Sequence, residues 1–412
     1  MSSGALSDVR VLDLTRLLPG GFCSLLLADF GAEVVKVEDT GMGDYVRWAP
    51  PYYGSEEHQA LGTRSALYLS LNRGKRSIRL DLKSDAGREA LLRLAREYDV
   101  ILESFRPGVL DRLGCGYEAL RQENPGIVYC AITGYGQTGP NTQRAGHDMN
   151  YLGLNGLLGM TGEPGGRPIQ SGGQIADLGG GALMAAFGVM AALRERERSG
   201  EGQQVDISMT DGSLAWLAMV AAQYLCDGQV PQRGRGNLNG GLACYLPYEA
   251  ADGWVTCGAL EAKFWRNFCE GVGRPDLIEK QFAAPDSEDG QAIAAIFRER
   301  TRDEWLAFNN EHDAMIEPIL DLDEALSSEL VTEREMVVEM EQPELGPVRL
   351  LGLPVKLDRT PGDATRPAPA LGEHTADVLG EAGFSEDEVR ALLESGAAAG
   401  TNAETEGARF MG

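Results

Sequence analysis

The chain has 412 residues, enough for two domains or for one large domain with a smaller insertion. Its 62 acidic and 37 basic residues give a formal net charge of −25, which argues against nucleic acid or an anionic membrane as a general partner. Seven scattered cysteines without a C-x-x-C pair favour reduced thiols over disulfides or a zinc site. With no signal-like N-terminus and no apolar run of the ~18–20 residues that span a bilayer, we expect a soluble cytoplasmic protein.

The N-terminal half alternates between strand-like and helix-like segments. Residues 9–14 and 33–38 predict buried strands, and residues 20–30 predict the helix between them. This βαβ unit implies a parallel sheet and a right-handed crossover. Further strands are predicted at 77–82, 99–103, 127–132 and 205–209, and helices at 84–98 and 178–195. The turn after the first strand lacks the G-x-G-x-x-G pattern, which argues against a nicotinamide site.

A linker-like composition at 228–241 separates a second region, with a hairpin at 245–248 and 254–257 and three helices before residue 330. We therefore predict an α/β fold with a Rossmann-like large domain and a smaller α+β domain. The predicted boundaries are 1–225 for the first part of the large domain, 226–335 for the small domain and 336–395 for the segment that completes the large domain. Residues 396–412 are small and polar, which indicates a disordered tail.

Six cations lie close together in this acidic chain, opposed only by Asp81, and this favours an anion site: Arg64, Arg73, Lys75, Arg76, Arg79 and Lys83. Arg106 and Arg112 follow the strand at 99–103, where ligands collect in open α/β sheets. The structural alternative is that both arginines pair with surface carboxylates.

His147, one of four histidines in the chain, and Asp177, a carboxylate that follows a Gly-rich loop, form a candidate acid/base pair. Asp177 stands where a loop gives way to an apolar helix, so free backbone N–H groups of that helix are expected to face the site. Glycines 179–181 predict tight packing of this helix. The structural alternatives are a hydrogen-bonded histidine and an N-capping aspartate.

The ordered motifs at 11–16, 26–38, 72–77, 104–110, 133–140 and 144–148 resemble those of the family III CoA-transferases, which also contain the α-methylacyl-CoA racemases. The resemblance runs from about residue 7 to residue 395. It implies a CoA-thioester enzyme with a Rossmann-like large domain, two chains interlocked as a homodimer, and no metal or redox cofactor beyond the CoA moiety of the substrate.

Within this family the resemblance makes Asp177 the shared catalytic carboxylate. The motif at 146–151 is similar to that of the racemases, which makes His147 the second base and Glu261 the residue that orients it. Racemisation at C2 of a 2-methyl-branched acyl-CoA needs two such bases on opposite faces of an enolate. The alternative is a CoA-transferase in which Asp177 forms an acyl anhydride and an aspartyl-CoA thioester. A non-catalytic acyl-CoA-binding protein is the third possibility.

Contacts to CoA are implied by the resemblance at Lys75, Arg76, Leu80, Asp81, Leu82, Lys83, Ser104, Phe105, Arg106, Arg112, Gly146, Asp148, Met149, Asn150 and Tyr151. The chain departs from the family at Asp39, where an arginine is usual, so part of the nucleotide contact differs here.

Overall fold

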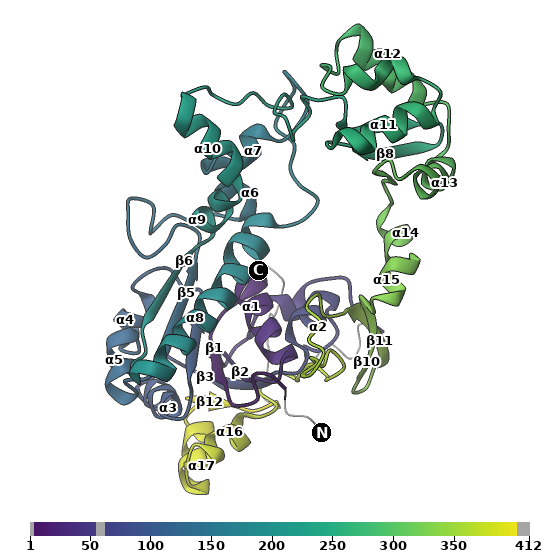
Figure 1. The fold of residues 1–412 in the computed structure, drawn as a ribbon. Coiled ribbons are helices and arrows are strands. Elements are labelled where there is room, and N and C mark those ends of the chain that lie inside the picture. Colours follow the sequence, from purple (N-terminus) through teal and green to yellow (C-terminus); the bar gives the residue numbers. More distant parts are fainter. Residues whose placement is uncertain (1–3, 55–61, 402–412) are drawn as a thin grey trace. The chain divides into compact units, whose positions relative to one another are not determined.

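The computed structural model describes residues 4–54 and 62–401. The chain divides into two compact units. The larger unit comprises residues 1–155, 173–216 and 330–412, and the smaller comprises residues 156–172 and 217–329. Figure 1 traces both along the chain.

A seven-stranded sheet in the order β12-β3-β2-β1-β4-β5-β6 forms the centre of the larger unit. Strands β1 to β6 are parallel to their neighbours, and β12 pairs antiparallel with β3. The predicted α/β fold is therefore confirmed. The strands are β1 (Arg10–Asp13), β2 (Glu33–Glu38), β3 (Arg76–Leu80), β4 (Val100–Glu103), β5 (Val128–Thr133), β6 (Gln204–Ser208) and β12 (Ala398–Ala399).

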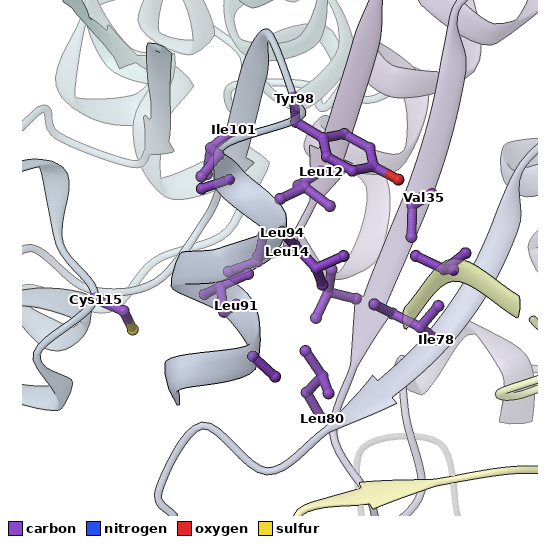
Figure 2. Packing of buried hydrophobic residues seen from close by; sticks show 14 of the residues in the cluster. Leu12, Leu14, Val35, Ile78, Leu80, Leu91, Leu94, Tyr98, Ile101 and Cys115 are labelled. Carbon is purple, nitrogen blue, oxygen red and sulfur yellow. The ribbon is translucent and has the colours of Figure 1, made fainter. Parts of the chain in front are cut away.

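Helices cover both faces of this sheet (Figure 1). On one face, α3 (Asp85–Ala95) packs Leu91 and Leu94 against Leu12 and Ile78 of the strands, as Figure 2 shows. On the other face lie α1 (Leu17–Asp29) and α8 (Met184–Ser199). Because both faces are buried, the central strands β4 and β5 consist entirely of buried residues and lack polar alternation, which is why they could be located from the sequence. Strand β6 near the edge alternates instead between exposed and less exposed residues.

The remaining elements of the larger unit are short. They are η1 (Tyr45–Trp48), α2 (Ala66–Asn72), α4 (Val109–Leu113), α5 (Tyr117–Glu123), α6 (Asp148–Leu154), η3 (Ile175–Leu183), α9 (Met209–Leu214), β10 (Val337–Gln342), β11 (Gly346–Leu351), α16 (Thr375–Glu381) and α17 (Glu386–Glu394).

The π-helix η3 runs directly into α8, and the continuous helix from residue 175 to 199 is long and apolar enough to cross a membrane by length and composition alone. Core helices of soluble proteins pass the same test. In this chain η3 and α8 pack against α1, α9, β5 and β6.

The smaller unit is built around a three-stranded antiparallel sheet of β7 (Tyr245–Ala250), β8 (Gly253–Gly258) and β9 (Ile316–Pro318). The predicted hairpin is confirmed. Its core stacks Phe297 between Tyr248 and Phe268, with ring centroids 4.1 and 5.1 Å apart. Its helical elements are α7 (Leu157–Met160), α10 (Ala218–Asp227), α11 (Ala262–Gly271), η5 (Pro275–Lys280), α12 (Glu288–Phe297), α13 (Arg302–His312) and α14 (Leu322–Ser327). The short helix η4 (Ala215–Leu217) and α15 (Glu329–Glu333) lie where the chain passes between the units.

The observed division differs from the expected boundaries. Residues 217–225, predicted for the large domain, belong to the smaller unit, and residues 330–335 belong to the larger one. Residues 156–172 belong to the smaller unit, because Arg233 donates to the carbonyls of Gly159 and Gly166, and Asn239 donates to that of Met160. The expectation of disorder from residue 396 is wrong for Ala398–Ala399, which form the edge strand β12. Residues 402–412 of the predicted tail lie outside the described residues.

Candidate active site

The order β3-β2-β1-β4-β5-β6 reverses direction between β1 and β4, and ligands of open α/β sheets bind at such a point beyond the carboxyl ends of the strands. The loop after β1 and the loop after β4 meet there, since the amide of Arg16 donates to Ser104 Oγ at 3.1 Å. A cavity of about 570 Å³ opens at this edge. It is lined by Arg16, Leu17, Pro19, Tyr45, Ser104, Phe105, Arg106, Pro107, Ile132, Thr133, Gly134, Thr142, Arg144, Ala145, Gly146, His147, Asn150, Tyr151, Asp177 and Met209.

The two predicted catalytic side chains of the larger unit, His147 and Asp177, line this cavity from different elements. His147 is the N-cap of α6, with extended backbone angles, and its amide donates to Asn150 Oδ1 at 3.0 Å. Asp177 is the third residue of η3. The structure therefore brings together two residues that are thirty positions apart in the sequence.

The pKa of Asp177 is raised to about 6, mainly by burial, with a further contribution from the nearby Asp148 carboxylate and an opposing one from His147. A carboxylate with that pKa is ionised at neutral pH, but it binds a proton more tightly than an exposed aspartate does. Its environment therefore suits a group that accepts and returns a proton.

The first backbone amides of η3 are not free, contrary to expectation. Those of Ala176 and Asp177 donate to Asp148 Oδ1 at 2.6 and 3.0 Å. The amides of Ile175 and Leu178 donate to the carbonyls of Gly173 and Gln174. The predicted role of these amides toward an enolate oxygen is wrong for this arrangement, because all four already have acceptors.

The glycines of η3 allow a close approach to α9. A Cβ atom on Gly180 would lie 2.6 Å from the carbonyl oxygen of Met209 and 2.7 Å from the amide nitrogen of Ser213. Both of these are backbone atoms, so neither can move aside as a side chain would. The predicted tight packing of this helix is confirmed.

Tyr151 closes the inner wall of the cavity. Its hydroxyl donates to the carbonyl of Gly146, and its ring contacts Tyr135 edge-on, with centroids 5.2 Å apart. Burial raises the pKa of Tyr151, and Asp177 contributes to that shift. The tyrosine therefore stays protonated and orients the loop that precedes His147.

A second cavity, of about 650 Å³, lies beyond the carboxyl ends of β2 and β3. Five residues that the resemblance assigns to CoA line it together: Leu80, Asp81, Leu82, Lys83 and Phe105. Arg16, Tyr45 and Phe105 line both cavities. The two hollows are thus neighbours and could hold one elongated ligand.

The cation cluster predicted as one anion site is dispersed instead. Lys75 is buried, with Nζ 3.4 Å from Asp13 Oδ2 and 2.7 Å from Ser24 Oγ, and burial lowers its pKa to about 8. Arg76 pairs with Glu33 and Glu381 at the start of β3, opposite the edge that carries the cavities. These two residues are not placed to contact CoA, which corrects the prediction.

Other cations of the cluster also have internal roles. Arg73 pairs with buried Asp29, with Nη2 and Oδ2 2.6 Å apart. Arg79 donates to backbone carbonyls of the loop after β2, including those of Thr40 and Gly41. Of the predicted cluster, Lys83 is the member that lines a described cavity.

The remaining predicted residues are divided between the site and other regions. Ser104, Phe105, Arg106, Gly146 and Asn150 line the first cavity. Arg112 and Met149 are exposed and lie outside the lining of both cavities. Asp148 is buried and faces the amides of η3. Glu261 is the exposed N-cap of α11 in the smaller unit, so its pairing with His147 stays a prediction.

Arg16, Tyr45 and Arg144 line the first cavity but were not predicted from the sequence as site residues. Arg16 Nη2 lies 2.6 Å from Asp39 Oδ2, and its guanidinium lies over the ring of Tyr45. Arg16 and Arg144 stand inside motifs used above for the resemblance, and this was an available signal. Nothing in the sequence around Tyr45 indicated a site.

No group of three or more potential metal-ligating side chains occurs among residues 4–54 and 62–401. All seven cysteines fall within those ranges and are free thiols.

Comparison with known proteins gives consistent matches along most of the chain. The model of CoA-transferase family III matches residues 6–375. A succinyl-CoA:mesaconate CoA-transferase of Haloarcula hispanica is 38% identical, with 92% of this chain and 97% of the relative covered. An α-methylacyl-CoA racemase of Mus musculus is also 38% identical, with 94% and 96% covered. The crystal structure of a CAIB/BAIF family protein from Brucella suis superposes with a TM-score of 0.79 at 32% identity, covering 92% of this chain and 100% of that one.

Proposed function

Because the chain belongs to CoA-transferase family III, we propose that it acts on an acyl-CoA and epimerises C2 of a 2-methyl-branched acyl group. The observation that carries this proposal is the presence of His147 and Asp177 in the lining of one cavity. A transferase needs the carboxylate alone, whereas an epimerase needs a second proton carrier.

The chemistry explains why two groups are required. A proton on the carbon next to a thioester is a very weak acid in water, so a positioned base has to remove it. Inversion then requires that a different group deliver a proton to the opposite face of the planar enolate. An imidazole can carry or release a proton near neutral pH, and Asp177 with a pKa of about 6 is a better base than an ordinary aspartate.

The second cavity supports the assignment of CoA as the carrier of the acyl group. Lys83 and Arg16 on its wall are suited to the phosphates, while Leu80 and Leu82 provide apolar surface for the nucleotide. Phe105 and Tyr45, which line both cavities, would then contact the pantetheine arm between them. On this proposal both proton transfers use side chains of the chain, and no cofactor beyond the CoA moiety is required.

CoA transfer between carboxylic acids is the second candidate. Arg16, Arg106 and Arg144 line the cavity of Asp177, and Arg106 has no ion pair with any described residue. These guanidinium groups could hold the carboxylate of an acceptor acid. Asp177 would attack the thioester carbonyl, CoA thiolate would leave, and the thiolate would return to form an aspartyl-CoA thioester as the first acid departs.

Two further proposals follow from family membership. We propose that the active form is a homodimer with a second copy of the chain, interlocked as in the resemblance described above. We also propose a cytoplasmic location, which the seven free thiols support.

The test is incubation of the protein with a pure 2-methylacyl-CoA epimer in deuterated water. We expect deuterium at C2 together with the opposite epimer, detected by mass spectrometry and chiral chromatography. If C2 stays unlabelled while CoA passes to an added free acid through a hydroxylamine-sensitive intermediate, the epimerase proposal is wrong and the transferase proposal replaces it.

A further inference from the structure

The carboxylate of Asp148 does not face the cavity. Its side chain is buried, with 7% of the residue exposed. One oxygen, Oδ1, accepts hydrogen bonds from the amides of Ala176 and Asp177 at 2.6 and 3.0 Å. Charge-assisted bonds of this kind are among the stronger hydrogen bonds in proteins. Asp148 therefore holds the backbone of the residue whose side chain enters the cavity.

Asp148 also follows His147 directly and is the first residue of α6. A single residue thus connects the two elements that carry the proposed bases, α6 and η3. We propose that Asp148 is a positioning residue, which fixes Asp177 in the cavity that His147 lines and sets its charge environment, and not a ligand of CoA. The role of Asp148 in catalysis rests on the proposed function. Its hydrogen bonds to the backbone of η3 do not.

The electrostatic part follows from the groups that face Asp177. Burial is the main cause of its raised pKa, the negative charge of Asp148 raises the pKa further, and His147 lowers it. Tyr151 is close enough for Asp177 to raise its pKa, and Arg16, Arg106 and Arg144 line the same cavity. Asp148 is thus the acidic neighbour that opposes these basic groups, and it makes Asp177 a stronger base.

Two substitutions separate the two roles. Asp148→Asn keeps an oxygen that accepts the two amide hydrogen bonds but removes the charge. Asp148→Ala removes both. The matched control is Asp211→Asn, which removes a carboxylate from the first turn of α9, a helix that also packs on η3.

The first measurement is the titration of the Asp177 carboxyl carbon by ¹³C NMR, with Asp177→Asn identifying the signal. It does not depend on activity. We expect Asp148→Asn to lower the pKa of Asp177 by about one unit, because a like charge is removed. Asp211→Asn should leave that pKa unchanged. An unchanged titration in Asp148→Asn would overturn the electrostatic role.

The second measurement is the pH profile of C2 exchange. In Asp148→Asn the acidic limb of the pH profile of kcat should move to lower pH. The KM for the acyl-CoA should stay within about twofold of that of the unsubstituted protein. Asp148→Ala should lose roughly a hundredfold in kcat, as misplacement of a reacting group does. A thermal melt shows whether this variant is folded, and a folded Asp148→Ala with full kcat would overturn the positioning role. If the unsubstituted protein exchanges no C2 proton, the proposed function fails, and the titration still decides the inference.

Discussion

Asp177 occupies a position where its ionised form is disfavoured in the folded protein. Its pKa rises from 3.8 to about 6, mainly through burial. Between these values the folded state binds more protons than the unfolded state, so stability falls as pH rises through this window and the loss persists above it. About two pKa units correspond to about 3 kcal/mol. The buried position of Asp177 thus makes its carboxylate more basic and lowers the stability of the folded protein at neutral pH.

We therefore predict that Asp177→Asn is more stable than the unsubstituted protein at pH 8, by about 2–3 kcal/mol, and that the gain disappears below pH ~4, where the aspartate is protonated in both states. Urea unfolding at the two pH values measures this difference. An equal effect of the substitution at both pH values would contradict the assigned cause.

The sequence was a better guide to which residues form the site than to which groups surround each of them. His147 and Asp177 were found from their motifs, and both line the cavity. Lys75 was misassigned because a cluster of cations in the sequence does not show which of them pair with buried groups. Here Lys75 pairs with Asp13 and donates to Ser24. Asp148 was misassigned for a similar reason, since a motif does not show which way a carboxylate faces.

At the scale of elements, the position of the Asp177 carboxylate depends on the contact between η3 and α9. Gly180 of η3 lies so close to the backbone of Met209 and Ser213 that no Cβ fits without movement. The π-helical form of η3 was not predictable, because glycine-rich and apolar sequence is equally compatible with an α-helix. The buried strands β4 and β5 and the helix that became α3 were predictable, because their signals lie in the local sequence.

We predict that Gly180→Ala destabilises the protein by about 1–3 kcal/mol, because overpacking displaces η3 from α9, and that it lowers kcat by moving Asp177. Gly380→Ala is the matched control, since Gly380 is a helical glycine of α16 with nothing within 4 Å of the added methyl group. Urea unfolding of both variants checks this. Equal stability of the two would show that η3 tolerates the methyl group and that the close contact is not required.

At the scale of the whole molecule, a chain with a net charge of −25 places its cations selectively. Arg73 and Lys75 neutralise buried carboxylates, whereas Arg16, Arg106 and Arg144 line the cavity of Asp177. In a parallel sheet, ligands bind beyond the carboxyl ends of the strands where the strand order reverses, here between β1 and β4. The sequence predicted a parallel sheet, so the edge of the sheet that carries the site was predictable. The partition of residues 156–172 into the smaller unit was not, because it depends on contacts distant in sequence, such as that of Arg233.

The central claim is that His147 and Asp177 act as two bases on opposite faces of C2. The most direct test gives each pure epimer of a 2-methylacyl-CoA to His147→Gln and to Asp177→Asn in deuterated water. We predict that neither variant inverts C2, and that each still exchanges the C2 proton of one epimer, a different epimer for each variant. Unimpaired inversion by His147→Gln, or loss of exchange with the same epimer in both variants, would contradict the two-base account.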